Sequence, residues 1–218
     1  MTADSLRTRL RSLPVFPEEI PDALHSEQVS DPMALFARWL DDAIEAGQPA
    51  PHAAVLATSR HNVPNARVIL LKDMDADGWY FATHVSSPTG IDLWDSPFAA
   101  LTFFWPFLGR QVRVSGPVLP TSPGASASDF LARPLASREA TLIGRQSQVL
   151  VDPSDYDAAT ESVRRVLEAD PAAVDPEWAL YLCAARTVEF WRASADRRHA
   201  RLRFSRRSGG WTAEHLWP

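Results

Sequence analysis

The stretch ARVILLKDMDADGWYFATH, residues 66–84, holds two runs of aliphatic and aromatic residues on either side of a polar turn. Short runs of this composition that are bounded by Gly, Asn or Asp are typical of paired β-strands. Three further runs follow the same pattern, namely AAVLATS (53–59), AALTFFW (99–105) and RQVRVSGPV (110–118). Several strands at such close spacing predict an antiparallel sheet or barrel in this part of the chain.

Helical segments flank the predicted strands. Asp31 and Pro32 suit the start of a helix that Gly47 ends, and further helical segments are expected near 89–95, within 126–147 and over 154–168. After them, ALYLCAARTVEFW (179–191), ARLRFSRR (200–207) and WTAEHLWP (211–218) predict strands that complete the sheet. We therefore expect a partly ordered arm over residues 1–30 and a single, mainly β domain with flanking helices over residues 31–218.

The composition is that of an ordinary soluble protein, and a cytoplasmic location is the default expectation. The chain has 45% hydrophobic residues and a formal net charge of -5, which argues against a general nucleic-acid binder. No run approaches the roughly 20 apolar residues of a membrane span, and the N-terminus lacks the apolar core of a signal peptide. The sequence contains no Cys/His cluster of the kind that would predict a metal site. The single cysteine, Cys183, is expected to be a small buried hydrophobic residue.

The first candidate site is the strand Arg67-Val-Ile-Leu-Leu-Lys72, whose Lys72 is the only lysine among 22 basic residues. A compact ammonium and a broad guanidinium are not interchangeable in a tight cavity, so this lysine is a candidate ligand-binding residue. We expect a buried strand with a cation near each end. Strict alternation would send Arg67 and Lys72 to opposite faces, unless the strand bends, bulges or ends between them. The alternative is a core strand with solvated ends.

The second candidate site is the basic segment from Arg197 to Phe204. Interpreted as a strand, it places Arg197, His199, Arg201 and Arg203 on one face and apolar residues on the other. Such crowding of like charges costs energy unless an anion or carboxylates neutralise it, so the face suits a phosphate-bearing ligand. The alternative is a solvated sheet edge that resists aggregation.

Weaker signals lie elsewhere in the chain. Arginine, serine and glutamine side chains near helix ends can bind oxyanions. Residues 133–137 and 145–147 contain such side chains and are therefore weak candidates for an anion site. Gln111 and Arg113 alternate with Val112 and Val114, so they point away from the valines. Trp191 closes the segment VEFW, where a tryptophan is more often a core residue than a cofactor contact.

Taken in order, these pieces resemble the pyridoxine/pyridoxamine 5′-phosphate oxidase family. The segments that carry the resemblance are DPMALFARWLDDA, ARVILLKDMDADGWYFATH, RQVRVSG, FLARP, RQSQ, VEFW, RHARLRF and GWTAEHLWP, with consistent spacing from residue 31 to the C-terminus. The resemblance implies an FMN-binding split β-barrel and a homodimer with FMN at the subunit interface. It also implies hydride transfer from a small-molecule substrate to flavin N5, with O2 as final acceptor and H2O2 as product.

The resemblance also implies roles for individual residues. The residues expected to hold FMN are Arg67, Val68, Ile69, Leu70, Leu71, Lys72, Thr83, Gln111, Gln146, Ser147, Trp191 and Arg201. Those expected to hold substrate are Lys72, Arg133, Ser137, Arg197 and His199, of which Arg197 and His199 are the expected catalytic residues.

The chain departs from the family pattern mainly on the substrate side. A tyrosine that helps to hold substrate phosphate corresponds to Asp129, and an Arg-Lys pair that grips the FMN phosphate corresponds to Pro88 and Thr89. The tight Arg-Leu-His-Asp-Arg motif has become Arg197-Arg-His-Ala-Arg201. These changes resemble the phenazine-pathway branch of the family, which acts in secondary metabolism.

We therefore favour an FMN-dependent oxidase of a reduced aromatic or heterocyclic metabolite, similar to a dihydrophenazine. One alternative is the vitamin B6 reaction that makes pyridoxal 5′-phosphate, because Lys72, Arg133 and Ser137 are all present. Another is a non-catalytic protein that binds flavin or pyridoxal phosphate on the same fold. A nucleic-acid binder that uses the C-terminal arginines is the least favoured.

Overall fold

The computed structural model describes residues 5–16, 20 and 29–218, and these form two compact units. Unit 1 comprises Met1–His52, Thr102–Val114 and Thr187–Pro218, and unit 2 comprises Ala53–Leu101 and Ser115–Arg186. Two long strands, β5 (Phe98–Trp105) and β6 (Arg110–Pro120), run through both units. Half of the predicted arm, residues 1–30, lies outside the described residues, and the described half includes the short helix α1 (Leu6–Ser12).

Most of the strands and helices occur where the sequence predicts them. The other strands are β1 (Ala53–Arg60), β2 (Val63–Leu70), β3 (Asp73–Met74), β4 (Trp79–His84), β7 (Trp178–Cys183), β8 (Thr187–Arg192), β9 (Ala200–Arg207) and β10 (Gly210–His215). The helices that follow α1 are α2 (Pro32–Glu45), α3 (Pro88–Asp95), α4 (Pro123–Leu131), α5 (Leu135–Leu142), α6 (Ser154–Ala169) and the 3-10 turn η1 (Pro106–Leu108). This confirms a mainly β protein with flanking helices.

The sheet has the strand order β10-β9-β8-β6-β5-β1-β2, with β7 joined to β6 and β4 to β7. The pairs β1–β2, β4–β7, β8–β9 and β9–β10 are antiparallel. Because β2 ends this order, one of its edges has no strand partner among the residues that the structure describes. The register places Leu56 of β1 opposite Arg67 of β2.

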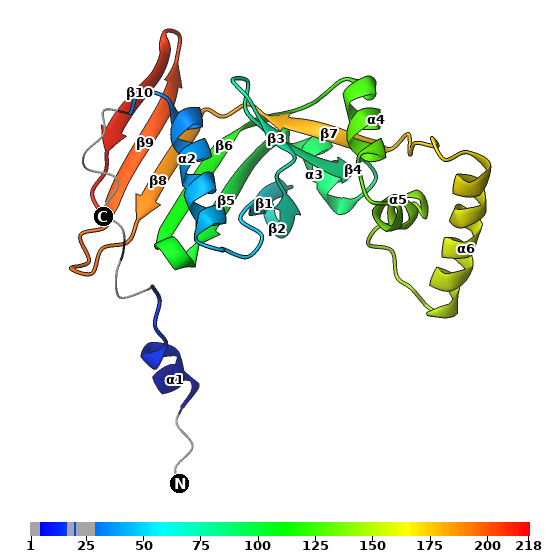
Figure 1. The fold of residues 1–218 in the computed structure, drawn as a ribbon, viewed down its shortest axis with the longest axis horizontal. Coiled ribbons are helices and arrows are strands. Elements are labelled where there is room, and N and C mark those ends of the chain that lie inside the picture. Colours follow the sequence, from blue (N-terminus) through cyan, green and yellow to red (C-terminus); the bar gives the residue numbers. More distant parts are fainter. Residues whose placement is uncertain (1–4, 17–19, 21–28) are drawn as a thin grey trace. The chain divides into compact units, whose positions relative to one another are not determined.

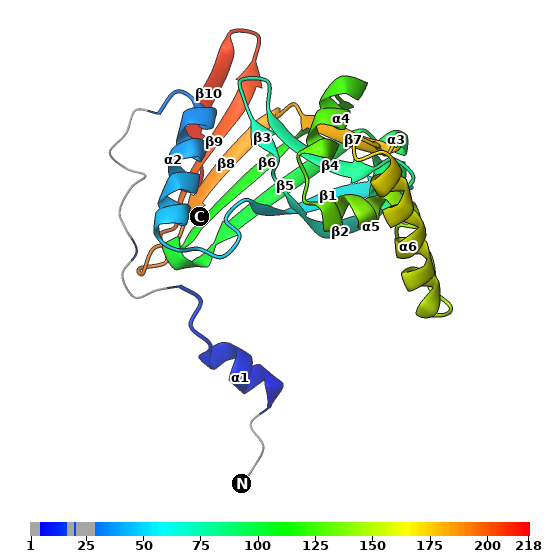
Figure 2. The same cartoon turned by 45° about the vertical axis from the view of Figure 1, so that its right-hand side comes forward.

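In unit 1, helix α2 begins and ends as the sequence predicts. Asp31 accepts a hydrogen bond from the backbone N–H of Met33 at 2.9 Å, and Gly47 adopts a positive φ of 68° after the last turn. The buried face of α2 packs aromatic rings against the strands, with Trp39 5.1 Å from Phe190 of β8 between ring centroids. Figures 1 and 2 both show α2 lying along the strands of this unit.

In unit 2, helices α5 and α6 pack against each other, and α4 packs on β7 (Figure 2). Helix α3 packs on β1, and its first turn is capped by the hydroxyl of Ser87, which accepts from the N–H of Gly90 at 3.1 Å. Cys183 of β7 is fully buried, as predicted, and burial raises the pKa of its thiol to about 12. The cysteine is therefore an inert core residue rather than a nucleophile.

Replacing Gly90 with alanine should destabilise unit 2, because a Cβ at this position would overlap the carbonyl oxygen of Val85 and lie 2.6 Å from that of His84. Backbone atoms cannot move aside cheaply, so we expect a loss of about 2 kcal/mol in the free energy of unfolding. Urea denaturation measures this loss. The control is Gly209→Ala, whose Cβ would meet nothing within 4 Å. Equal stabilities of the two variants would contradict the prediction.

Candidate functional site

The residues expected to bind cofactor and substrate fall into two sets, one in each unit. Unit 2 contains the members of the 67–72 segment, Thr83, Arg133, Ser137, Gln146 and Ser147. Unit 1 contains Gln111, Trp191, Arg197, His199 and Arg201.

The 67–72 segment is not a buried strand, and this expectation from the sequence was wrong. Side chains of Val68 and Leu70 are 67% and 46% exposed, because β2 lies at an edge of the sheet and, among the described strands, pairs with β1 alone. The strand ends at Leu70, and the backbone N–H of Lys72 instead donates to the carbonyl of Tyr80 at 2.8 Å. This end between the two cations is one of the arrangements that would let Arg67 and Lys72 serve one ligand.

Arg67 belongs to a network with helix α3. Its guanidinium donates to the hydroxyl of Thr58 at 2.5 Å and to a carboxylate oxygen of Asp92 at 3.3 Å. Thr58 and Asn65 also donate to the same oxygen of Asp92, at 2.6 Å and 3.1 Å. Burial raises the pKa of Asp92, but these hydrogen bonds and the charge of Arg67 outweigh it and hold the pKa below its ordinary value.

Thr83 lies at the end of β4, beside the start of the same helix. Its hydroxyl is 3.1 Å from that of Ser87, the residue that caps α3. Next along the chain, Pro88 is exposed and Thr89 is buried, at the two positions where the family pattern has cations. Thr83, Arg67 and the first turn of α3 thus share one part of unit 2.

Lys72 faces an acid. Its ammonium lies 3.8 Å from a carboxylate oxygen of Asp129 in α4, and the side chains of Lys72 and Asp129 are 27% and 13% exposed. The other oxygen of Asp129 accepts from the indole N–H of Trp178 at 2.8 Å, and Arg133 lies over the Trp178 ring, 4.0 Å from its centroid. Asp129 therefore lies beside two residues that the sequence assigns to substrate phosphate.

Burial lowers the pKa of Arg133, and the charges of Asp129 and Asp175 raise it in part. The Arg133 guanidinium also donates to the hydroxyl of Thr141 at 2.7 Å, and that hydroxyl donates to the carbonyl of Ser137 at 3.0 Å. Thr141, which the sequence reasoning did not single out, thereby links the two expected substrate ligands. Threonine is common inside helices, so the sequence alone could not have distinguished Thr141 as a candidate site residue.

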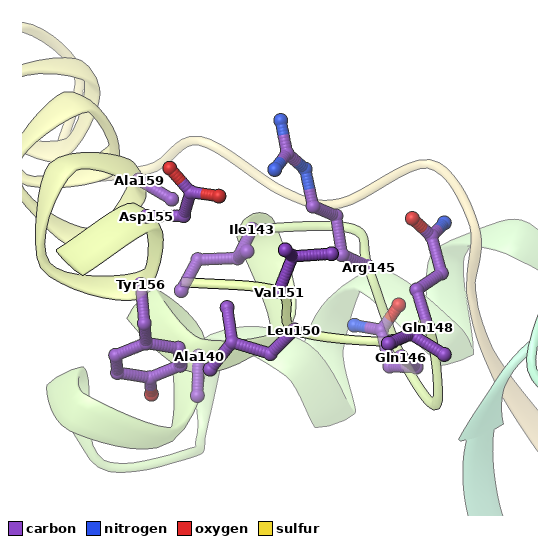
Figure 3. Close-up of a pocket in the computed structure, with 11 residues that line it drawn as sticks. Ala140, Ile143, Arg145, Gln146, Gln148, Leu150, Val151, Asp155, Tyr156 and Ala159 are labelled. Carbon is purple, nitrogen blue, oxygen red and sulfur yellow. The ribbon is translucent and has the colours of Figure 1, made fainter. Parts of the chain in front are cut away.

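Gln146 continues this network. Its amide N–H donates to the carbonyl of Thr141 at 2.9 Å, while its carbonyl oxygen Oε1 is buried without a hydrogen-bond partner among the described residues. Gln146 also lines a pocket of about 320 Å³ between α5, α6 and the loop that follows α5 (Figure 3). The pocket wall is mostly apolar and includes neither Lys72 nor Arg133.

In unit 1 the expected strand over residues 197–204 begins only at Ala200, so its extension to Arg197 and His199 was wrong. The carboxylate of Asp196 accepts from the hydroxyl of Ser194 and from the N–H of Arg198, and Arg197 adopts a positive φ of 66°. This tight turn interrupts any strand. His199 therefore lies in the loop before β9.

His199 and Trp191 nevertheless meet. Their ring centroids are 4.8 Å apart, and Nδ1 of His199 accepts from the backbone N–H of Ser194 at 3.1 Å. Phe16, from the predicted arm, packs on the same Trp191 at 5.5 Å and is a contact that the sequence did not indicate.

The basic face of β9 is neutralised by carboxylates. Arg201, opposite Trp191 in the register, donates twice to Glu189 at 2.9 Å and 2.8 Å. Arg203 donates to Glu214 at 2.9 Å. Gln111 is half-buried on the face opposite the buried Val112, as predicted.

These residues fit a flavin ring. The ring is flat and largely apolar, so it can cover exposed aliphatic side chains such as Val68 and Leu70. Among the described residues, no group of three or more His, Cys, Asp or Glu side chains is placed so that it could hold a metal ion.

Comparison with known proteins identifies the family. A family model described as pyridoxamine 5′-phosphate oxidase matches residues 40–176, and one described as pyridoxine 5′-phosphate oxidase C-terminal dimerisation region matches residues 178–218. The second match supports the expected homodimer. Within the described part of the chain, no helix has the length and apolarity needed to cross a membrane.

Curated relatives resemble the chain over nearly their whole length. Pyridoxine/pyridoxamine 5′-phosphate oxidase of Pseudomonas fluorescens (strain SBW25) is 38% identical over 90% of this chain and 94% of its own. The enzyme of the same name from Caulobacter vibrioides (strain NA1000 / CB15N) is 36% identical, over 92% and 90%.

Two solved structures share the fold and support the expected split β-barrel. PhzG from Burkholderia lata 383, in complex with tetrahydrophenazine-1-carboxylic acid, has a TM-score of 0.83 at 28% identity and covers 90% of this chain and 98% of its own. A pyridoxamine 5′-phosphate oxidase-related, FMN binding protein from Nostoc punctiforme has a TM-score of 0.70 at 16% identity, over 88% and 99%. The chain therefore belongs to the pyridoxamine 5′-phosphate oxidase family of FMN-dependent oxidases.

Proposed function

We propose that the protein oxidises a reduced aromatic or heterocyclic metabolite, with O2 as final acceptor. The observation that carries this choice of substrate is the position of Asp129, 3.8 Å from Lys72. A substrate phosphate needs an excess of positive charge, whereas the charges of Lys72 and Arg133 are offset by Asp129 and, at Arg133, also by Asp175, so that the formal charge does not exceed +1. That sum suits one carboxylate better than a phosphate dianion.

The relative with a reduced heterocycle supports the same choice. PhzG from Burkholderia lata binds tetrahydrophenazine-1-carboxylic acid, which has a single carboxylate and an oxidisable ring. Its chain superimposes on this one with a TM-score of 0.83.

We assign separate roles in cofactor binding and substrate binding to the candidate residues. The chemistry that FMN would supply when bound is hydride acceptance from the substrate and reoxidation by O2, with one H2O2 for each two-electron oxidation. Residues 67–72, Thr83, Gln111, Gln146, Ser147, Trp191 and Arg201 would hold the cofactor. Lys72, Arg133 and Ser137 would hold the anionic group of the substrate, and Arg197 and His199 would orient its ring.

A second candidate is the oxidation of pyridoxine or pyridoxamine 5′-phosphate to pyridoxal 5′-phosphate. It is favoured by the names of the curated relatives and by the presence of Lys72, Arg133 and Ser137. The two candidates differ in the charge of the group that Lys72 and Arg133 would bind.

Oxygen uptake and peroxide release distinguish the two. With added FMN, we expect turnover of a reduced phenazine carboxylate and little turnover of pyridoxine 5′-phosphate. Efficient oxidation of pyridoxine 5′-phosphate would establish the second candidate instead. A protein that shows no flavin spectrum even at high FMN concentration would contradict both.

The variant Asp129→Asn tests the role of the acid. The amide oxygen still accepts from Trp178, so the fold is retained while the negative charge next to Lys72 is lost. We expect kcat/KM for pyridoxine 5′-phosphate to rise about ten-fold, as one added favourable charge interaction permits. A matched control is Asp157→Asn, an exposed acid in α6. Equal effects of both variants would contradict the assignment.

A further inference from the structure

The buried acid Asp92 lies at the centre of the network that holds Arg67. One of its oxygens accepts three hydrogen bonds, from Thr58, Asn65 and Arg67, and the side chain is 4% exposed. All four residues lie in unit 2, on β1, β2 and α3. An arginine tied in this way to a buried carboxylate has much of its charge neutralised before any ligand arrives.

The second arginine that faces α3 is also paired. Arg60, at the end of β1, donates to Asp95 in the last turn of α3 at 2.5 Å. The sequence of α3, PTGIDLWD, contains two acids and no lysine or arginine. Two arginines therefore face two acids across β1, β2 and α3, and their formal charges cancel.

This part of unit 2 corresponds to the phosphate end of the proposed cofactor site. Pro88 and Thr89, in the first turn of α3, stand where the family pattern has its phosphate-gripping cations. Arg67 reaches the same helix through Asp92, whereas Lys72 pairs with Asp129 at α4. Of the two cations of the 67–72 segment, Arg67 is thus the one next to the expected phosphate position.

We propose that Asp92 is a specificity-determining residue of the cofactor site: it neutralises Arg67, so that the protein binds riboflavin, the flavin without a phosphate, nearly as tightly as FMN. The inference rests on the proposed function, because it takes the flavin site as given. Binding energy then comes from the ring, through the exposed aliphatic residues of β2. A phosphate gains little where the net formal charge is zero.

Titration of the flavin-free, full-length protein with FMN and with riboflavin tests this directly, through quenching of flavin fluorescence. Each unneutralised charge-assisted hydrogen bond to a phosphate is worth about ten-fold or more in affinity. We expect the two dissociation constants to agree within about ten-fold, and the FMN constant to depend weakly on salt. A preference for FMN above about 100-fold would overturn the inference. Failure of both flavins to bind would instead overturn the proposed function.

Two substitutions each raise the formal charge of this part of unit 2 by one, the first by adding a cation and the second by removing an acid. Pro88→Arg adds a cation at an exposed position of the first turn and should tighten FMN about ten-fold while leaving riboflavin unchanged. Pro88→Gln is the uncharged control of similar length. Asp92→Asn keeps an acceptor for Thr58 but releases the charge of Arg67, so the preference for FMN over riboflavin should rise.

The Asp92→Asn result is decisive in either direction. A lowered preference for FMN would mean that Asp92 orients Arg67 toward the phosphate, which contradicts the inference. Thermal unfolding of each variant, followed by circular dichroism, confirms that the compared proteins are folded. If Asp92→Asn does not fold, the Pro88→Arg and Pro88→Gln pair still decides the question, since equal FMN affinities would overturn it.

Discussion

Replacing His199 with alanine is expected to lower kcat/KM for the substrate that the enzyme oxidises about 100-fold. The Nδ1 atom of His199 accepts a hydrogen bond from the N–H of Ser194, so the neutral ring carries its proton on Nε2. The ring also packs on Trp191 at 4.8 Å between centroids, which fixes its orientation. A donor held in this way can bind an acceptor of the substrate, and alanine removes both the donor and the ring contact. Peroxide release at low substrate concentration measures the loss.

The variant His199→Gln separates the donor from the ring. Glutamine places an amide N–H near the position of Nε2, so we expect part of the lost kcat/KM to return although the contact with Trp191 is gone. His215→Ala, at the exposed end of β10, is a matched control that should leave kcat/KM unchanged. Wild-type kcat/KM in His199→Ala would show that this histidine does not contact the substrate.

The strands and the main helices could be predicted because local patterns determine them. The alternation in RQVRV gives the buried faces of Val112 and Val114, and Asp31 with Pro32 defines the start of α2. These features depend on residues within one or two turns of one another. The family resemblance adds the order of the segments, which local patterns alone do not contain.

The errors arose where exposure or a turn depends on more distant information. An aliphatic run such as residues 68–71 predicts a buried strand. Only the order of the strands shows that β2 lies at an edge of the sheet. The turn at Ser194 and Asp196 could have been recognised, since both residues are typical of turns, but the alternating arginines obscured it.

Asp92 shows what a single sequence hides. Nothing within its own helix marks it as important, because its partners Thr58 and Arg67 lie 34 and 25 residues away in the sequence. The same holds for Asp129, whose identity was noticed as a departure but whose contact with Lys72 required the structure. Charge pairing between distant segments therefore determines the character of the candidate site more than its motifs do.

Replacing Arg67 with methionine should lower the free energy of unfolding by about 3 kcal/mol at neutral pH, since removal of one partner leaves a buried charge uncompensated. Asp92 is 4% exposed, and the guanidinium of Arg67 is its charged partner at 3.3 Å. The matched control is Arg60→Met, whose pair with Asp95 is 43% and 31% exposed and should contribute less than about 1 kcal/mol. Urea denaturation of both variants measures the difference, and the double variant Arg67→Met/Asp92→Asn should recover part of the loss because no buried charge remains.

The loss should also depend on pH in a defined direction. The pKa of Asp92 is lower in the folded protein than its ordinary value, so the stability it contributes is present above about pH 4 and is lost as the pH falls through the folded-state pKa. The stability difference between wild type and Arg67→Met should therefore shrink below about pH 4, where the protonated Asp92 no longer needs a cation. A difference that stays constant between pH 7 and pH 3, or one no larger than that of Arg60→Met, would mean that Arg67 stabilises the protein through packing of its aliphatic stem rather than through the charge of Asp92.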